Sequence, residues 1–95
     1  MANPVTVSFE VIPLVEDPYT VVDRAIEVVQ QSGVTYVVGP HETTMEGDLE
    51  RLLGIVQAGH RAALEAGAPH VVTVVKIVES IHGSTIADKV EKYRG

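Results

Sequence analysis

The segment VTYVVGPHETTMEGD, residues 34–48, decides the fold that the sequence predicts for this chain. A run of β-prone residues at 34–38 ends at Gly39-Pro40, and a second short strand at 43–46 follows after a turn. Proline cannot donate a hydrogen bond to a ladder, and a Gly-Pro pair favours a turn, so the two strands are expected to lie next to each other in the chain. Asp48 is then a good N-cap for a helix.

One strand and one helix precede these two strands. Residues 5–12 alternate strictly between two faces, which predicts a half-buried strand. Its apolar face holds Val5, Val7, Phe9 and Val11. We expect a helix that is capped by Thr20, with Asp23 completing a capping box, and that ends at Gly33. The apolar stripe of this helix is expected at Val22, Ala25, Ile26 and Val29.

The second long helix is expected to run from its cap at Asp48 to Gly67. Its apolar face is expected at Leu49, Leu52, Leu53, Val56, Ala63 and Leu64. Gly54 and Gly59 each weaken a helix by about 1 kcal/mol relative to alanine, which predicts that close packing compensates.

The next strand, at 70–81, is apolar on both faces. One face holds Val71, Val75 and Ile77 with Thr73, and the other holds Val72, Val74 and Val78 with Lys76. A strand that is apolar on both sides is expected to be covered on both sides. Lys76 is expected to pack its aliphatic stem among the valines and to pair with a carboxylate such as Glu10 on the first strand.

The element order is therefore β-α-β-β-α-β, followed by a short helix from Thr85 to about Arg94 that a capping box with Asp88 begins. This order predicts the α+β class and a ferredoxin-like sandwich, with a four-stranded antiparallel sheet and two helices on one face. A single domain is expected over residues 1–95. Because two helices cover only one face of such a sheet, we expect a second copy to cover the other, in a homodimer or homotetramer.

Composition argues against several classes of function. Seven basic and 13 acidic residues give a net charge of −6, which disfavours binding to nucleic acid or to an anionic membrane. No cysteine is present, so a disulfide, a thiolate metal site and a thiol nucleophile are excluded. The four histidines are 19, 10 and 12 residues apart, which is not the spacing of a metal-site pair, and no metal site is expected. Without a signal peptide or a membrane-spanning run, a cytoplasmic protein is expected.

The densest polar segment surrounds the predicted turn between the second and third strands. Thr43 and Thr44 point to opposite faces of the third strand, and Glu46 shares the face of Thr44. Ser8 and Glu10 share the open face of the first strand, which is adjacent to the third in this fold. These hydroxyls and carboxylates are expected to converge either in a small-molecule site or in a hydrogen-bonded subunit interface, although the same residue types also suit a plain strand and a helix cap.

The chain also carries longer motifs. They are the segments 5–8, 15–17, 23–27 and 85–94, together with Tyr36-Val37-Val38-Gly39-Pro40 followed by Thr43-Thr44-Met45-Glu46-Gly47. These motifs resemble the small thiamine-binding protein family over nearly the whole chain. The resemblance implies ferredoxin-like subunits, assembled as a dimer of dimers, that bind thiamine or its hydroxymethylpyrimidine part without catalysis. By motif it implies a ligand region at Tyr36, Thr43, Thr44 and Glu46, with Ser8 as a neighbour.

The resemblance implies that thiamine is a bound ligand and not a catalytic cofactor. Its aminopyrimidine needs a donor–acceptor pair, which threonine hydroxyls and Glu46 can supply, and its thiazolium cation needs a carboxylate or an aromatic face. Tyr36 can stack on a flat ligand or serve as a core ring. Val74 departs from the small polar residue that the family carries near Lys76, so the open face is more apolar here.

Two other functions stay open at this point. One is a small cofactor-poor enzyme of the monooxygenase type, which needs a deep apolar cavity with an aromatic or histidine side chain near the substrate. One Phe, three Tyr and no clustered histidines argue against that enzyme. The other is a regulatory module that binds an effector at a subunit interface and acts on a protein target.

Overall fold

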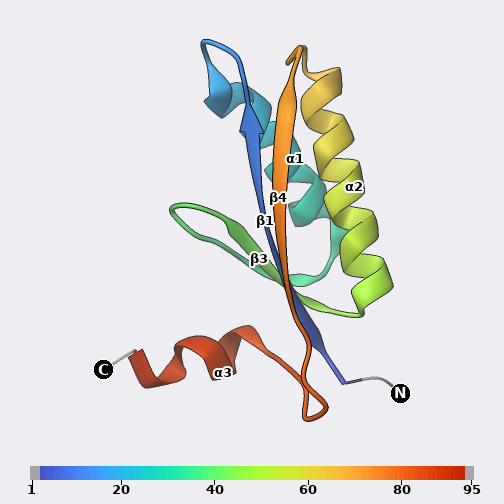
Figure 1. Cartoon of the computed structure of the whole chain (residues 1–95), viewed down its shortest axis with the longest axis vertical. Coiled ribbons are helices and arrows are strands. Elements are labelled where there is room, and N and C mark those ends of the chain that lie inside the picture. Colours follow the sequence, from blue (N-terminus) through green and yellow to red (C-terminus); the bar gives the residue numbers. More distant parts are fainter. Residues whose placement is uncertain (1–2, 94–95) are drawn as a thin grey trace.

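The computed structural model describes residues 3–93, and Figure 1 follows the chain through them. The strands are β1 (Val5–Pro13), β2 (Thr35–Val38), β3 (Thr43–Gly47) and β4 (Val71–Val78). The helices are α1 (Pro18–Ser32), α2 (Leu49–Glu65) and α3 (Ile86–Val90), which a 3-10 turn at Glu91–Tyr93 extends. The order is the predicted one, and Arg94, the predicted end of the tail helix, lies outside the described residues.

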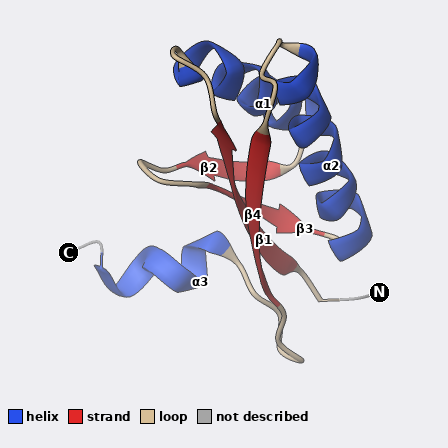
Figure 2. Cartoon of the chain, turned by 45° about the horizontal axis from the view of Figure 1, so that its top comes forward, coloured by secondary structure: helices blue, strands red, loops and turns tan. Residues whose placement is uncertain are grey.

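The four strands form one antiparallel sheet in the order β2-β3-β1-β4. β1 is central and pairs with β3 on one side and with β4 on the other. Figure 2 shows α1 and α2 together on one side of this sheet and α3 well apart from them. This topology confirms the predicted ferredoxin-like α+β fold.

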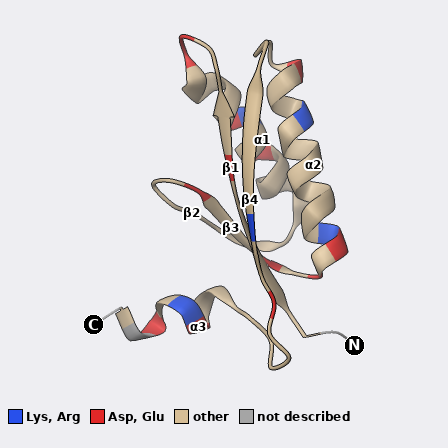
Figure 3. Cartoon of the chain, in the orientation of Figure 1, with Lys and Arg blue, Asp and Glu red and all other residues tan. Residues whose placement is uncertain are grey.

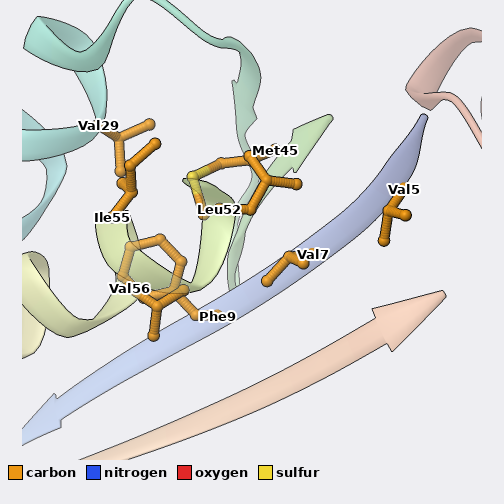
Figure 4. Close-up of a cluster of buried hydrophobic side chains, with 8 residues drawn as sticks. All are labelled: Val5, Val7, Phe9, Val29, Met45, Leu52, Ile55 and Val56. Carbon is orange, nitrogen blue, oxygen red and sulfur yellow. The ribbon is translucent and has the colours of Figure 1, made fainter. Parts of the chain in front are cut away.

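The main core lies between the sheet and the two long helices. β1 directs alternate side chains into this core, as predicted. β3, α1 and α2 contribute the remaining core side chains, and Figure 4 shows the whole cluster. The members are Val5, Val7, Phe9, Val29, Met45, Leu52, Ile55 and Val56. Because Met45 and Leu52 have no exposed surface, each contributes about 1.5–3 kcal/mol of hydrophobic stabilisation.

α1 begins earlier than the sequence predicts. Asp17 is its N-cap and Pro18 its first residue, because the φ of proline is already helical and its missing N–H has no partner to lose there. Thr20 therefore lies inside the helix, where its hydroxyl donates to Asp17 Oδ2 at 2.8 Å. The predicted cap at Thr20, with Asp23 completing a capping box, is wrong. The predicted end at Gly33 is confirmed, since this residue has a φ of 82°.

The buried faces of both long helices differ in part from the prediction. On α1, Val22 and Ile26 are only half-buried. The buried residues of α1 are Val21, Ala25 and Val29. On α2, Leu53 and Leu64 are exposed, so their predicted place in the core is wrong. Each residue turns a helix by about 100°, which carries Leu53 away from the buried face of Leu52. The buried residues of α2 are Leu52, Ile55, Val56, Gly59 and Ala63.

The structure confirms two of the three local features that the sequence predicts for α2. Asp48 caps the helix as predicted, because the backbone N–H of Arg51 donates to Asp48 Oδ2 at 3.2 Å. The close packing predicted at the glycines is confirmed at Gly59, where an added Cβ would lie 3.3 Å from Cε2 of Phe9. It is wrong at Gly54, where such a Cβ would have no neighbour within 4 Å.

β4 is an edge strand with apolar side chains exposed on both faces. Val72 and Val74 on the open face are 48% and 44% exposed, and Ile77 on the helix face is 47% exposed. One chain alone does not cover this strand on both sides, because α1 and α2 pack mainly over β1. Cover of the open face by a second copy stays a prediction. β4 also ends at Val78, short of the predicted 81.

Within residues 3–93, no helix is both long enough and apolar enough to cross a membrane.

Candidate functional site

The open face of the sheet brings three of the five predicted site residues close together. β1 and β3 pair with Ser8 opposite Thr44 and Thr6 opposite Glu46. The hydroxyls of Ser8 and Thr44 are hydrogen-bonded at 2.8 Å. Glu46 is engaged elsewhere, since its Oε1 accepts from the backbone N–H of Ile86, at the start of α3, at 2.8 Å. On this face the two hydroxyls are thus bonded to each other, and the carboxylate helps to hold the tail helix.

The other two predicted site residues lie on the opposite face. Thr43 and Tyr36 are on the helix side of β3 and β2, where Thr43 is paired with Phe9 and Tyr36 packs against the main core. The sheet therefore separates Tyr36 and Thr43 from Ser8, Thr44 and Glu46. One ligand region that includes all five residues is not what this geometry favours.

Lys76 pairs with a different carboxylate from the one expected. Its Nζ lies 2.7 Å from Oε1 of Glu42, which belongs to the turn between β2 and β3. The predicted pairing with Glu10 is wrong, because Lys76 is opposite Ser8 in the register of β1 and β4, and Val74 stands opposite Glu10. The Lys76 side chain thus reaches across the open face toward the turn.

A cleft opens where the β2–β3 turn leaves β1. Its walls come from β1, from the first turns of α1 and from the turn itself, and we call it the hairpin cleft. Its lining includes Glu10, Val11, Tyr19, Val22, Ile26 and the segment 38–43. The volume is about 370 Å³, within the range of small-molecule sites. Figure 1 shows the turn between β2 and β3 projecting away from β1, below the start of α1.

The cleft exists because β1 extends beyond the end of its pairing with β3. β3 begins at Thr43, which is paired with Phe9, whereas β1 continues to Pro13 beside β4 alone. The N–H of Leu14 donates to the carbonyl of His70, on the β4 side. Successive residues of a strand direct their backbone groups to opposite sides, so the N–H and C=O of Val11 are directed toward the cleft. A strand edge is thus available there for hydrogen bonding.

The wall of the cleft also offers a free hydroxyl. Within the described residues, the Thr43 side chain makes no hydrogen bond, although the residue is only 6% exposed. Among the described residues, every fully buried side-chain N or O atom has a hydrogen-bond partner. Because the Thr43 oxygen has none, it must keep some contact with solvent. The hydroxyl of Thr43 is therefore positioned to bond a molecule in the cleft.

Charge in the cleft is negative. Glu10 and Glu42 both line it. Lys76 offsets the charge of Glu42, whereas Glu10 has no ion pair among the side chains that the structure describes. A cation in the cleft would balance this negative charge.

The turn that carries Glu42 is held by its own backbone. The N–H of Gly39 donates to the carbonyl of Glu42 at 2.9 Å. A Cβ on residue 39 would lie 3.0 Å from that carbonyl oxygen, so glycine is what lets the turn close.

Histidines do not form a site with these groups. Nδ1 of His60 on α2 lies 2.6 Å from the hydroxyl of Thr73 on β4, at the sheet edge opposite to β2 and Tyr36. In the part of the chain that the structure describes, no group of three or more His, Asp or Glu side chains could hold a metal ion.

Sequence reasoning missed most of the cleft. The sequence prediction groups Glu10 with Ser8, and it includes neither Glu42, Tyr19 nor the flank of α1 among the site residues. One signal was available for that flank. Val22 and Ile26 extend the apolar surface of α1 beyond the width that the core needs, which indicates a second apolar contact on that side of the helix.

Comparison with known proteins gives a consistent picture. The sequence model of the family described as thiamine-binding protein matches residues 7–94. A UPF0045 protein of Clostridium perfringens is 46% identical over 90 residues, which cover 93% of this chain and 95% of the relative.

Solved structures agree with the sequence matches. A domain of unknown function from Bacillus cereus has a TM-score of 0.93 and 52% identity, with 99% of this chain and 93% of that chain covered. A putative thiamine biosynthesis/salvage protein from Thermotoga maritima has a TM-score of 0.87 and 42% identity, with 96% and 99% covered. The chain therefore belongs to the thiamine-binding protein family.

Proposed function

We propose that this protein binds thiamine, or its hydroxymethylpyrimidine part, in the hairpin cleft without transforming it. The observation that carries the proposal is the cleft itself, which combines apolar walls, the unpaired hydroxyl of Thr43 and two carboxylates in the lining. Family membership, and the description of the Thermotoga maritima relative as a putative thiamine biosynthesis/salvage protein, support the same ligand.

The chemistry of thiamine matches each part of the cleft. The flat aminopyrimidine fits between Val22 and Ile26 of α1 and the turn, where apolar side chains exclude water. Its alternating donors and acceptors suit the backbone groups of Val11 and the hydroxyl of Thr43. The thiazolium cation fits beside Glu10 and Glu42, and Tyr19 offers an aromatic face at the mouth.

A purely catalytic role has less support. The enzyme considered from sequence needs a histidine and an aromatic ring in one apolar cavity, yet His60 and Tyr36 lie toward opposite edges of the sheet. We therefore propose a carrier or sensor role, in which thiamine is cargo or signal and not a catalytic cofactor.

A homo-oligomer is part of the proposal. The accessible surface of the chain is 6262 Å², whereas a compact monomer of 10.2 kDa exposes roughly 5,300 Å². The chain alone therefore leaves more surface uncovered than a compact monomer of its size. β4 is the natural contact, because its edge is long and carries one charged residue, Lys76, whereas monomers protect such edges with charges or prolines. We propose that two copies pair through this edge, and that dimers associate further.

Neighbouring threonines on opposite faces provide a matched test of the binding site. Calorimetric titration should show thiamine binding by the wild-type protein. Thr43→Val removes a hydroxyl from the cleft and should weaken binding about tenfold, the value of one hydrogen bond to a buried group. Thr44→Val removes one from the open face and should leave affinity within about twofold, because its partner Ser8 is outside the cleft. Absence of heat with millimolar thiamine, or a larger loss with Thr44→Val, would refute the proposal.

A further inference from the structure

Glu42 lines hollows on both faces of the sheet. Besides the hairpin cleft, it lines a hollow on the open face that we call the trough. The trough has a volume of about 240 Å³, and its lining includes Thr6, Ser8, Glu42, Thr44, Lys76 and Lys89. Its floor is the hydroxyl pair on β1 and β3, and its rim holds one lysine from β4 and one from α3. Figure 3 marks basic positions on both β4 and α3.

The trough has the composition of an anion site except for one residue. Two ammonium groups supply positive charge, and lysine binds phosphate as a point charge. In the pair of Ser8 and Thr44, one O–H donates to the other oxygen, so one O–H of the pair remains free to donate. Among the lining residues only Glu42 is acidic, and its carboxylate sits 2.7 Å from the ammonium of Lys76. In this state Lys76 is neutralised and Lys89 alone attracts an anion.

The same carboxylate has a second use. Glu42 is 30% exposed and Lys76 is 64% exposed, so their ion pair is in contact with solvent and is worth little free energy. A cation in the hairpin cleft, next to Glu10 and Glu42, competes with Lys76 for this carboxylate. When Glu42 turns toward the cleft, the ammonium of Lys76 is released into the trough.

We propose that the trough binds a phosphate group and that Glu42, exchanging between Lys76 and a cation in the hairpin cleft, couples the two sites. The coupling rests on the proposed function of the cleft, whereas the trough as a phosphate site does not. By linkage, a cleft cation raises phosphate affinity and phosphate raises cation affinity by the same factor. The value of an exposed ion pair sets this factor at about two- to fivefold.

The first experiment tests the trough without thiamine. Inorganic phosphate is titrated into the wild-type protein and into Glu42→Gln at constant ionic strength. The variant keeps the size of the side chain and frees Lys76, so phosphate should bind about two- to fivefold more tightly. The added substitution Lys76→Gln should abolish this gain. Glu27→Gln is the matched control, because it removes the same charge from another exposed ion pair, with Arg24 on α1, and should change nothing.

The second experiment tests the coupling. Saturating thiamine should raise the phosphate affinity of the wild-type protein about two- to fivefold and should have no such effect on Glu42→Gln. Thiamine monophosphate then distinguishes a phosphate ester of the cleft ligand from free phosphate as the occupant of the trough. If the protein binds the monophosphate more tightly than thiamine, one ester spans both sites. If it binds the two equally, the trough takes free phosphate.

The outcomes separate the two proposals. If Glu42→Gln binds phosphate no more tightly than the wild type, or gains as much as Glu27→Gln does, the trough proposal fails whatever thiamine does. If phosphate binds the variant but thiamine binds neither protein, the cleft function fails and the trough remains. If both ligands bind and neither changes the affinity of the other, the coupling is refuted.

Discussion

The turn at Gly39 allows a direct test of how the hairpin cleft is built. In Gly39→Ala, the new Cβ would lie 3.0 Å from the carbonyl oxygen of Glu42, a backbone atom that cannot move without opening the turn. The backbone conformation itself suits alanine, so the unfolded chain loses entropy and the variant gains about 0.4–1 kcal/mol. Overpacking by one methyl group costs about 1–3 kcal/mol. The balance is a net loss of about 1 kcal/mol.

Two measurements follow from this estimate. Thermal unfolding of Gly39→Ala, at the same protein concentration as the wild type, should show Tm lowered by about 4–8 °C. Thiamine affinity should also fall, because the carboxylate of Glu42 moves with its backbone. A variant with unchanged Tm and unchanged affinity would refute the steric account of the turn and the place of Glu42 in the cleft.

Three further predictions concern the rest of the fold. Gly54→Ala should stabilise α2 by about 1 kcal/mol, since no atom lies within 4 Å of the new methyl group, and a lower Tm would mean that a partner covers this face. Leu52→Ala should destabilise the chain by about 2–5 kcal/mol in denaturant unfolding, because the side chain has no exposed surface; a loss below about 1 kcal/mol would contradict the core described above. Val72→Lys should shift light-scattering mass toward the 10.2 kDa of one chain while circular dichroism stays unchanged, and an unaltered oligomer would rule out the β4 edge as the contact.

The sequence predicted the sheet well because its signals are local. The alternation in β1 and the stop at Gly39-Pro40 depend on neighbouring residues, and the observed register set Ser8 opposite Thr44 as the fold required. The start of α1 was predicted less well, because Thr20 and Pro18 both offer a local signal and proline at the first position prevailed.

The candidate site was predicted only in part, for a geometric reason. Residue type and strand period place Thr43 and Thr44 on opposite faces, but they do not say which face is hollow. That depends on β1 extending beyond β3, a difference in strand length that no single motif carries. The partner of Lys76 was missed for the same reason, since Glu42 reaches it from a turn and not from a paired strand.

The central claim is that the hairpin cleft holds the ligand, and electron density for thiamine in crystals of the assembled protein tests it most directly. We predict density between α1 and the β2–β3 turn, with the pyrimidine against Thr43 and Val11 and the thiazolium beside Glu10 or Glu42. Density on the open face, against Ser8, Thr44 and Glu46, would contradict the claim even though the fold and the family would stand.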